Sequence, residues 1–364
     1  KLKIIYISNS IGNKAQGGSS LSGLHFLEML KQKFPKQKIT VLSDSLHNSI
    51  LQAFSGIIFL KSINKMPRTL NLLAWLKFWI KYLVNLLCYE TKILDCKGHN
   101  VYLFVNSFSN LLEKVSLKNY SNLVKVCVVR GDVDSFKFQP LDNQVDPLSW
   151  PINYLNNFDE LIYVSKGIQE NWKEHVKKSN HYLPNSINEH EFIQKKSKNP
   201  YKNEKFNILI VGSLQYRKGQ ELVPKIAKIL SRHDVEFHCV GGISSNDGGD
   251  EIKKILLENN VNYHGHSNKI FDYIYHADIC LMLSKSEAFP RTVAEYLFIG
   301  KPVITTDVSG ATEMVQHKLN GYIVSNKCNN IAGEFAKKIN SLLNDKKLRK
   351  QFSVESKKKY EQQF

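Results

Sequence analysis

Two carboxylates and a basic loop form the pattern in this sequence that could do chemistry. Glu287 and Glu295 open and close the segment EAFPRTVAE, and Arg217 and Lys218 stand in an earlier loop, QYRKGQ. Carboxylates accept hydrogen bonds from hydroxyl groups, and fixed cations stabilise negative charge that builds on phosphate oxygens. The plain alternatives are a Glu287 that caps a helix, a Glu295 on an exposed helix surface and a solvated basic loop.

The segment around the two glutamates resembles the signature of the retaining glycosyltransferases of family 4, which are two-domain enzymes of the GT-B fold. The resemblance implies that Glu287 faces the donor sugar and that Glu295 accepts hydrogen bonds from the ribose hydroxyls of a nucleotide sugar. It also implies that backbone N–H groups of this segment point at sugar and phosphate, namely those of Phe289, Arg291 and Thr292. Family members often carry asparagine where this chain has Arg291, which would add a cation or alter which hydroxyls are bound.

The basic loop resembles the loop with which the family holds the diphosphate of its sugar nucleotide. Gly212 follows an apolar stretch that predicts a strand over 206–211, and Arg217 and Lys218 precede an amphipathic helix expected from Gln220. Departure of a nucleoside diphosphate builds charge on phosphate oxygens, which these cations would stabilise. No Asp-x-Asp is followed by ligands at a fitting spacing. The sequence therefore predicts transfer without a metal or other cofactor, with retention of anomeric configuration through same-face attack.

Two further loops are expected to contact the substrates. The resemblance implies that the loop at Gly265 and His266 clasps the nucleotide base mainly through backbone groups, and a uridine diphosphate sugar is the favoured donor. A plain surface histidine is the alternative for His266. Gly17 and Gly18 stand where the family keeps a glycine-rich loop, which would let the backbone approach a ligand closely. A purely structural turn is the alternative there.

The loop after the strand expected at 124–130 departs from the family pattern. Relatives commonly have a histidine there, close to the transferred sugar, whereas this chain reads RGDVD from Arg130. Ligands of open α/β sheets bind at the carboxyl ends of strands. Asp132 is therefore the residue expected to accept hydrogen bonds from sugar or acceptor hydroxyls, and a structural ion pair between Arg130 and Asp132 is an equal alternative.

The order of apolar stretches predicts an α/β protein of the GT-B type, in which two Rossmann-like domains have parallel sheets that face each other across a cleft. At 364 residues the chain is long for one core and sufficient for two. A polar, basic stretch without apolar periodicity predicts a linker between them. The expected organisation is an acceptor domain over 1–187, the linker over 188–205, a nucleotide-sugar domain over 206–345 and a basic C-terminal helix over 346–364.

The formal charge of +17 calls for a partner of opposite sign, such as nucleic acid, anionic lipid or a phosphorylated substrate. Within 61–90, a helix is expected to place Trp75 and Trp79 opposite a stripe of lysines, which suits an anionic membrane surface. The alternative is an ordinary helix packed on the sheet. Scattered cysteines and an N-terminus that enters a strand at once indicate a cytoplasmic protein, peripheral on the inner face of the plasma membrane if 61–90 binds lipid.

The whole pattern predicts a retaining, metal-independent glycosyltransferase. It would move a sugar from a nucleotide sugar to a hydroxyl of a glycan or lipid-linked saccharide in cell-surface polysaccharide biosynthesis. One alternative is a non-catalytic GT-B partner subunit, which the altered loop at Arg130 keeps open. The weakest alternative is a nucleic-acid-binding protein, because the positive charge is not accompanied by a recognisable nucleic-acid-binding module. Nucleic acid is therefore not expected as a partner.

Overall fold

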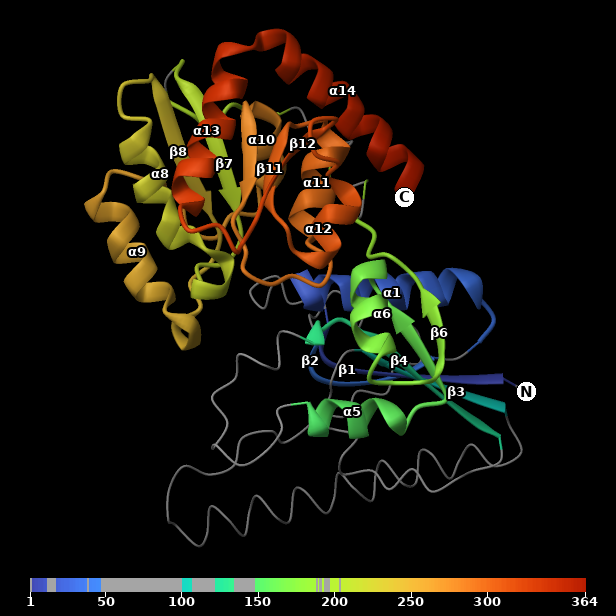
Figure 1. Ribbon diagram of the computed structural model, residues 1–364. Coiled ribbons are helices and arrows are strands. Elements are labelled where there is room, and N and C mark those ends of the chain that lie inside the picture. Colours follow the sequence, from blue (N-terminus) through green and yellow to red (C-terminus); the bar gives the residue numbers. More distant parts are fainter. Residues whose placement is uncertain are drawn as a thin grey trace, which may run out of the picture. The chain divides into compact units, whose positions relative to one another are not determined.

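In the computed structural model the chain forms two compact α/β units (Figure 1). One unit comprises Lys1–Val164 and Gln169–Leu183, and the other comprises Ser165–Ile168 and Pro184–Phe364. The residues that the structure describes are 2–11, 18–37, 39–46, 100–106, 122–133, 148–187, 189, 192, 197–202 and 204–364. The segment 61–90, in which a membrane-binding helix was predicted, lies outside the described residues, as does Gly17.

The N-terminal unit is built on a parallel sheet. Its described residues contribute six strands in the order β2-β1-β3-β4-β5-β6. Ile5, Leu103 and Val128 of the central strands are almost completely buried, as expected where a parallel sheet is apolar along its length. The elements are β1 (Leu2–Ile11), α1 (Gly18–Lys33), β2 (Ile39–Leu46), β3 (Asn100–Asn106), β4 (Leu123–Val129), α5 (Ser149–Asn156), β5 (Glu160–Tyr163), α6 (Lys166–Lys173) and β6 (Ser179–Tyr182). The first turn of α6 belongs to the other unit, and α6 joins the N-terminal unit from Gln169.

The C-terminal unit holds a second parallel sheet, whose described strands follow the order β12-β11-β10-β7-β8-β9. The prediction of an α/β protein with two parallel sheets is therefore confirmed. The strands are β7 (Phe206–Val211), β8 (Val235–Val240), β9 (Asn262–Tyr263), β10 (Ile279–Met282), β11 (Val303–Thr306) and β12 (Gly321–Val324). The α-helices are α8 (Val223–Ile229), α9 (Gly249–Glu258), α10 (Ile270–His276), α11 (Arg291–Ile299), α12 (Ser309–Met314), α13 (Ile331–Asn344) and α14 (Lys346–Gln363).

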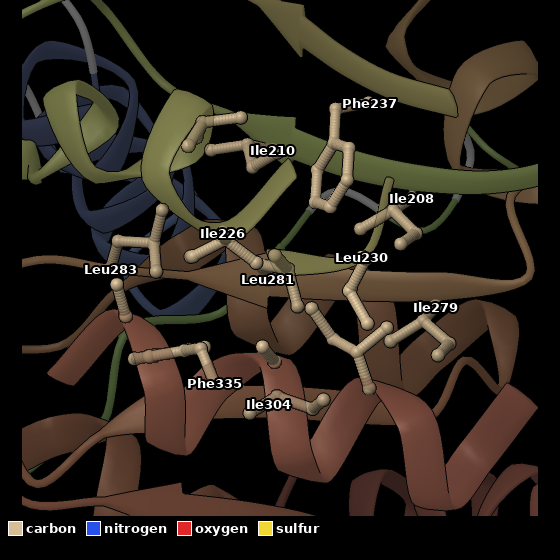
Figure 2. Close-up of a cluster of buried hydrophobic side chains, with 14 of the residues drawn as sticks. Ile208, Ile210, Ile226, Leu230, Phe237, Ile279, Leu281, Leu283, Ile304 and Phe335 are labelled. Atoms are coloured by element: carbon tan, nitrogen blue, oxygen red, sulfur yellow. The ribbon is translucent and has the colours of Figure 1, made fainter. Parts of the chain in front are cut away.

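The core of the C-terminal unit lies between its sheet and the helices α8 and α13. Figure 2 shows side chains of β7, β8, β10 and β11 meeting side chains of those two helices. Ile208 of β7, Ile226 of α8 and Phe335 of α13 have no exposed surface. Burial of each such side chain contributes roughly 1.5–3 kcal/mol relative to exposure, so this layer fixes the strand ends from which the loops of interest emerge.

The helix predicted from Gln220 starts later than expected. Two short 3-10 turns, Tyr216–Lys218 and Gln220–Leu222, precede α8, which begins at Val223. The reason is Gly219 between the two turns, which has a left-handed backbone with φ of +74° and interrupts a regular helix. The basic residues consequently lie on a tight turn.

Side chains of the predicted linker pack into the C-terminal unit. The longer segment of that unit starts at Pro184 and includes these side chains. The ring of Phe192 lies 6.0 Å from that of Phe271 and 5.7 Å from that of Phe298. The Tyr201 hydroxyl donates to the carbonyl oxygen of Tyr273 at 2.7 Å.

The basic segment predicted over 346–364 forms α14, which belongs to the C-terminal unit. Phe352 has no exposed surface, and the Ser353 hydroxyl donates to the carbonyl oxygen of Gly300 at 2.6 Å, where α11 ends. A search of the described residues finds no helix with the length and apolar character needed to cross a bilayer.

Candidate functional site

The strand order of the C-terminal unit reverses beside β7. The chain runs from β7 to β8 and β9 on one side and then returns to β10, which pairs with the other side of β7. Ligands of open α/β sheets bind outside the carboxyl ends of the strands at such a switch point. The loop after β7 carries Arg217 and Lys218, and the loop after β10 carries Glu287. Both loops therefore flank the position where a ligand is expected.

A backbone hydrogen bond and ion pairs connect these two loops. The N–H of Lys285 donates to the carbonyl oxygen of Arg217 at 2.8 Å. The Lys218 ammonium donates to Oε1 of Glu287, and Nη1 of Arg217 lies 3.4 Å from the same oxygen. The hydroxyl of Ser284 donates to that oxygen at 2.9 Å. The structure therefore brings Glu287, Arg217 and Lys218 together in one cluster.

Glu287 is an ionised carboxylate at neutral pH. Its side chain is 11% exposed, and burial acts to raise the pKa of a carboxyl group. The charges of Lys218 and Arg217, with hydrogen bonds from Lys218 and Ser284, outweigh this burial and hold the pKa of Glu287 below its usual value. The two cations for which the sequence predicted a diphosphate partner thus face a carboxylate in the structure.

The turn that presents the cations is held by Gly219 and Gln220. A Cβ atom on Gly219 would lie 2.2 Å from the carbonyl oxygen of Leu283, so the close approach of the two loops requires glycine. Nε2 of the buried Gln220 donates to the carbonyl oxygen of Ser213 at 2.9 Å, and its Oε1 accepts from the N–H of Gln215 at 3.4 Å. Sequence reasoning missed Gln220, because a glutamine at a helix start carries no signal that distinguishes this role from exposure.

Helix α11 follows the Glu287 loop and carries Glu295. Pro290 precedes its first residue and provides no side-chain cap, so the cap at this position does not come from Glu287. The side chain of Glu295 is 12% exposed, and its Oε1 lies 3.6 Å from Nη2 of Arg291, so Glu295 is not on an exposed surface. As the first residues of α11, Arg291 and Thr292 present N–H groups that the helix itself cannot satisfy.

Phe289 and Gly212 have mainly local packing roles that are visible in the structure. Phe289 is 4% exposed, and its ring lies 5.9 Å from that of Phe364. The N–H of Gly212 donates to the carbonyl oxygen of Val240 at 2.9 Å, which extends the pairing of β7 and β8 by one residue. The basic loop therefore begins at Gly212, directly after the carboxyl end of β7.

The loop between β9 and α10 contains Gly265 and the exposed His266. The carbonyl oxygen of Gly265 accepts from the N–H of Gly241 at 2.8 Å. Directly before it, Nε2 of His264 lies 3.0 Å from Nδ1 of His238, whose Nε2 lies 3.0 Å from Oδ1 of Asn207. Burial, followed by the neighbouring His264, lowers the pKa of His238 to about 4, so His238 is neutral at physiological pH. No sequence pattern indicated this contact between the buried His238 and the half-buried His264.

Asp132 belongs to the N-terminal unit, where α6 holds it. Asp132 is 5% exposed, and its Oδ1 accepts from Nδ2 of Asn171 at 2.9 Å. The neighbouring Arg130 donates from Nε to Oδ1 of Asn106 at 2.5 Å and from Nη2 to the carbonyl oxygen of Ser22 at 3.4 Å. Arg130 is thus fixed to β3 and α1 at the carboxyl end of β4.

Gly18 is the first residue of α1. The glycine-containing loop predicted after β1 therefore ends before Gly18, which contributes to a helix N-terminus instead. A helix of this length, 16 residues, has N–H groups at its start that can receive an anion.

The C-terminal unit also contains the region that matches a known protein family. Residues 191–359 match the family described as glycosyl transferases group 1. A protein of Klebsiella pneumoniae described as an uncharacterized 41.2 kDa protein in the cps region is 31% identical over 136 residues, which are 37% of each chain. The capsular polysaccharide biosynthesis glycosyltransferase CapM of Staphylococcus aureus is 28% identical over 169 residues, 44% of this chain and 43% of that protein. The chain spans between about a third and a half of the length of these relatives.

Solved structures support the fold over the whole chain. The structure of Anabaena Alr3699/HepE in complex with UDP and glucose aligns with a TM-score of 0.76 and 17% identity, covering 100% of this chain and 96% of that one. The glycosyltransferase WaaG, described as involved in lipopolysaccharide biosynthesis, aligns with a TM-score of 0.71 and 13% identity, covering 99% and 95%. The predicted GT-B fold is thereby confirmed. Residues 191–359 thus resemble the glycosyl transferases group 1 family, and both units share the fold of solved glycosyltransferases.

Proposed function

We propose that the protein is a retaining glycosyltransferase of family 4 that transfers a sugar from a UDP-sugar to a hydroxyl of a glycan or lipid-linked saccharide. The observation that carries this proposal is the cluster of Glu287, Lys218 and Arg217 at the switch point beside β7. A carboxylate for sugar hydroxyls and two cations for phosphate oxygens stand there within contact of one another. The description of CapM as a capsular polysaccharide glycosyltransferase supports a role in cell-surface polysaccharide synthesis.

In the proposed reaction the bond between the anomeric carbon and the diphosphate oxygen breaks, and the acceptor oxygen bonds to the same face of that carbon. The acceptor hydroxyl passes its proton to the departing phosphate. Arg217 and Lys218 stabilise the charge that develops on the leaving diphosphate, in place of a metal ion. Glu287 binds the donor sugar and shares these cations with the diphosphate, while Glu295 accepts hydrogen bonds from the ribose.

Further donor contacts are proposed for the loops around this cluster. Gly212, which has no side chain, would let the phosphate approach the basic loop closely. The N–H groups of Phe289, Arg291 and Thr292 would contact phosphate and sugar, and the loop at Gly265 and His266 would contact the base. In the N-terminal unit, Asp132 is proposed to contact the sugar or the acceptor. A helix N-terminus at Gly18 would add N–H groups for an anion.

The donor is tested by a thermal-shift screen with UDP, GDP and ADP and their sugars. We expect the midpoint of unfolding to rise with UDP and UDP-sugars, because a ligand that binds only the folded state adds stability by mass action. The same screen with EDTA should give the same shift if cationic side chains replace a metal. A rise with GDP or ADP alone would assign another base, and no rise with any nucleotide would favour the non-catalytic subunit.

We also propose a cytoplasmic location, with peripheral contact to anionic membrane through 61–90. Liposome flotation tests this contact. The protein is expected to float with vesicles that contain anionic lipid and to lose binding when Trp75 and Trp79 are both replaced by serine. Equal flotation of the double variant and the unmodified protein would remove this segment as the anchor.

A further inference from the structure

Arg291 is a buried arginine with one side-chain nitrogen left over. The residue is 8% exposed, and its Nη2 lies 3.6 Å from Oε1 of Glu295, one helical turn further along α11. Nη1 is buried and has no hydrogen-bond partner in the part of the chain that the structure describes. Because a guanidinium group stays charged and carries only donors, a buried Nη1 without an acceptor costs free energy.

The position of Arg291 adds a second electrostatic cost. Arg291 is the first residue of α11, a helix of nine residues whose N-cap, Pro290, makes no side-chain hydrogen bond. The N-terminus of a helix carries partial positive charge, so a cation is unfavourable there and an anion is favourable. A cationic side chain and a helix N-terminus at the same place together favour an anionic ligand.

The charge of the surrounding cluster points the same way. Arg217, Lys218 and Arg291 carry three positive charges, whereas Glu287 and Glu295 carry two negative charges. Both cations of the basic loop already face Glu287, and Arg291 faces Glu295 through Nη2 alone. The surplus positive charge lies with Arg217 and Lys218, which share one carboxylate, while Nη1 of Arg291 adds a buried donor that finds no acceptor among the described residues.

We propose that Nη1 of Arg291 donates a charge-assisted hydrogen bond to a phosphate oxygen of the nucleoside diphosphate. The inference rests on the proposed function, because it assigns a ligand atom within the proposed donor site. The planar fork of the guanidinium suits this double role, since Nη2 can stay on Glu295 while a small shift of the atoms that bury Nη1 brings Nη1 to the ligand. Arg291 is then a substrate-binding residue through its side chain, and its single cation serves the phosphate while it stays in contact with Glu295.

Titration calorimetry with UDP tests the contact, with GDP and ADP as parallel probes. Arg291→Gln is expected to weaken UDP binding by about 10- to 100-fold, the range expected for a hydrogen bond to a charged group. Arg291→Lys keeps the charge but lacks the fork, so an intermediate loss is expected. Arg232→Gln removes the same charge from an exposed position in the same unit and is expected to bind UDP like the unmodified protein.

A comparison of UDP with 2′-deoxy-UDP separates a direct contact from an effect through Glu295. Glu295→Gln is expected to reduce the preference for UDP over its deoxy analogue, whereas Arg291→Gln is expected to weaken both ligands equally and keep the preference. If Arg291→Gln is poorly folded, the double variant Arg291→Met/Glu295→Gln removes both charges of the pair. It is expected to bind UDP at least about 10-fold more weakly than Glu295→Gln alone.

Three results would overturn the inference. Arg291→Gln could bind UDP as tightly as the unmodified protein, it could lose the preference for UDP over 2′-deoxy-UDP as Glu295→Gln does, or the double variant could bind no more weakly than Glu295→Gln alone. If the unmodified protein binds none of UDP, GDP and ADP, the proposed function itself is wrong. Nucleotide binding by the unmodified protein with no loss in Arg291→Gln would instead leave that function standing and remove only the contact.

Discussion

Replacement of Glu287 by glutamine is expected to lower the rate of sugar transfer by about 10²-fold or more, with Lys218→Ala expected to do the same. Each side chain would then supply about 3 kcal/mol of transition-state stabilisation. Glutamine keeps the volume of Glu287 but removes the charge that Lys218 and Arg217 now share. The measurement is the turnover number with saturating UDP-sugar and the acceptor that gives product.

A surface pair of the same chemistry provides the control for this prediction. On α9, Nζ of Lys254 lies 3.8 Å from Oε1 of Glu258, and both side chains are more than half exposed. Exposed pairs of this kind contribute roughly 0–1 kcal/mol, so Glu258→Gln should leave turnover and stability unchanged. Near-normal transfer in both Glu287→Gln and Lys218→Ala would show that this cluster does not serve the reaction.

Replacement of Gly219 by alanine is expected to cost both stability and activity. The left-handed backbone at this residue disfavours any side chain by about 1–2 kcal/mol. The added Cβ would also meet the carbonyl oxygen of Leu283 at 2.2 Å, which is backbone and cannot swing away. The loop must shift, and a displacement of Lys218 by about 1 Å can cost on the order of 10²-fold in rate.

The matched control for this change is Gly242→Ala. Gly242 also follows a strand of the same sheet, but an added Cβ there meets no atom within 4 Å. Thermal unfolding and nucleotide binding should therefore change for Gly219→Ala and stay constant for Gly242→Ala. Equal midpoints and equal UDP affinities for the two variants would contradict the role given to Gly219.

Most of the sheet architecture could be predicted from the sequence. Buried parallel strands are apolar along their length, so stretches such as FNILIV at Phe206 and DICLML at Asp278 gave the strands directly. The 3-10 turns around Gly219 were not predicted, because the glycine interrupts a pattern that otherwise has helical periodicity. Strand β12 is only four residues long and starts with a glycine, so its place in the sheet depends on pairing with β11.

The candidate site was predictable where chemistry shows in residue type. Glu287, Arg217 and Lys218 are charged residues in glycine- or proline-containing loops that follow apolar strands, and the structure brings the three together. Ser284 and Gln220 could not be found in this way, because their roles depend on partners that the fold supplies. The packing of Phe192 and Tyr201 within the predicted linker could not be found for a similar reason, since their partners lie in α10 and α11.

The position of β7 in its sheet has a consequence for folding during synthesis. Strands β7, β8 and β9 are consecutive in the chain and pair in that order, but β10 must return to the free side of β7. Glu287 follows β10, so the turn with Arg217 and Lys218 lacks its carboxylate partner until β10 and the loop after it have left the ribosome. A nascent chain that stops before β10 therefore exposes one edge of β7 together with two unmatched cations, which opens this stage to misfolding and to chaperone binding.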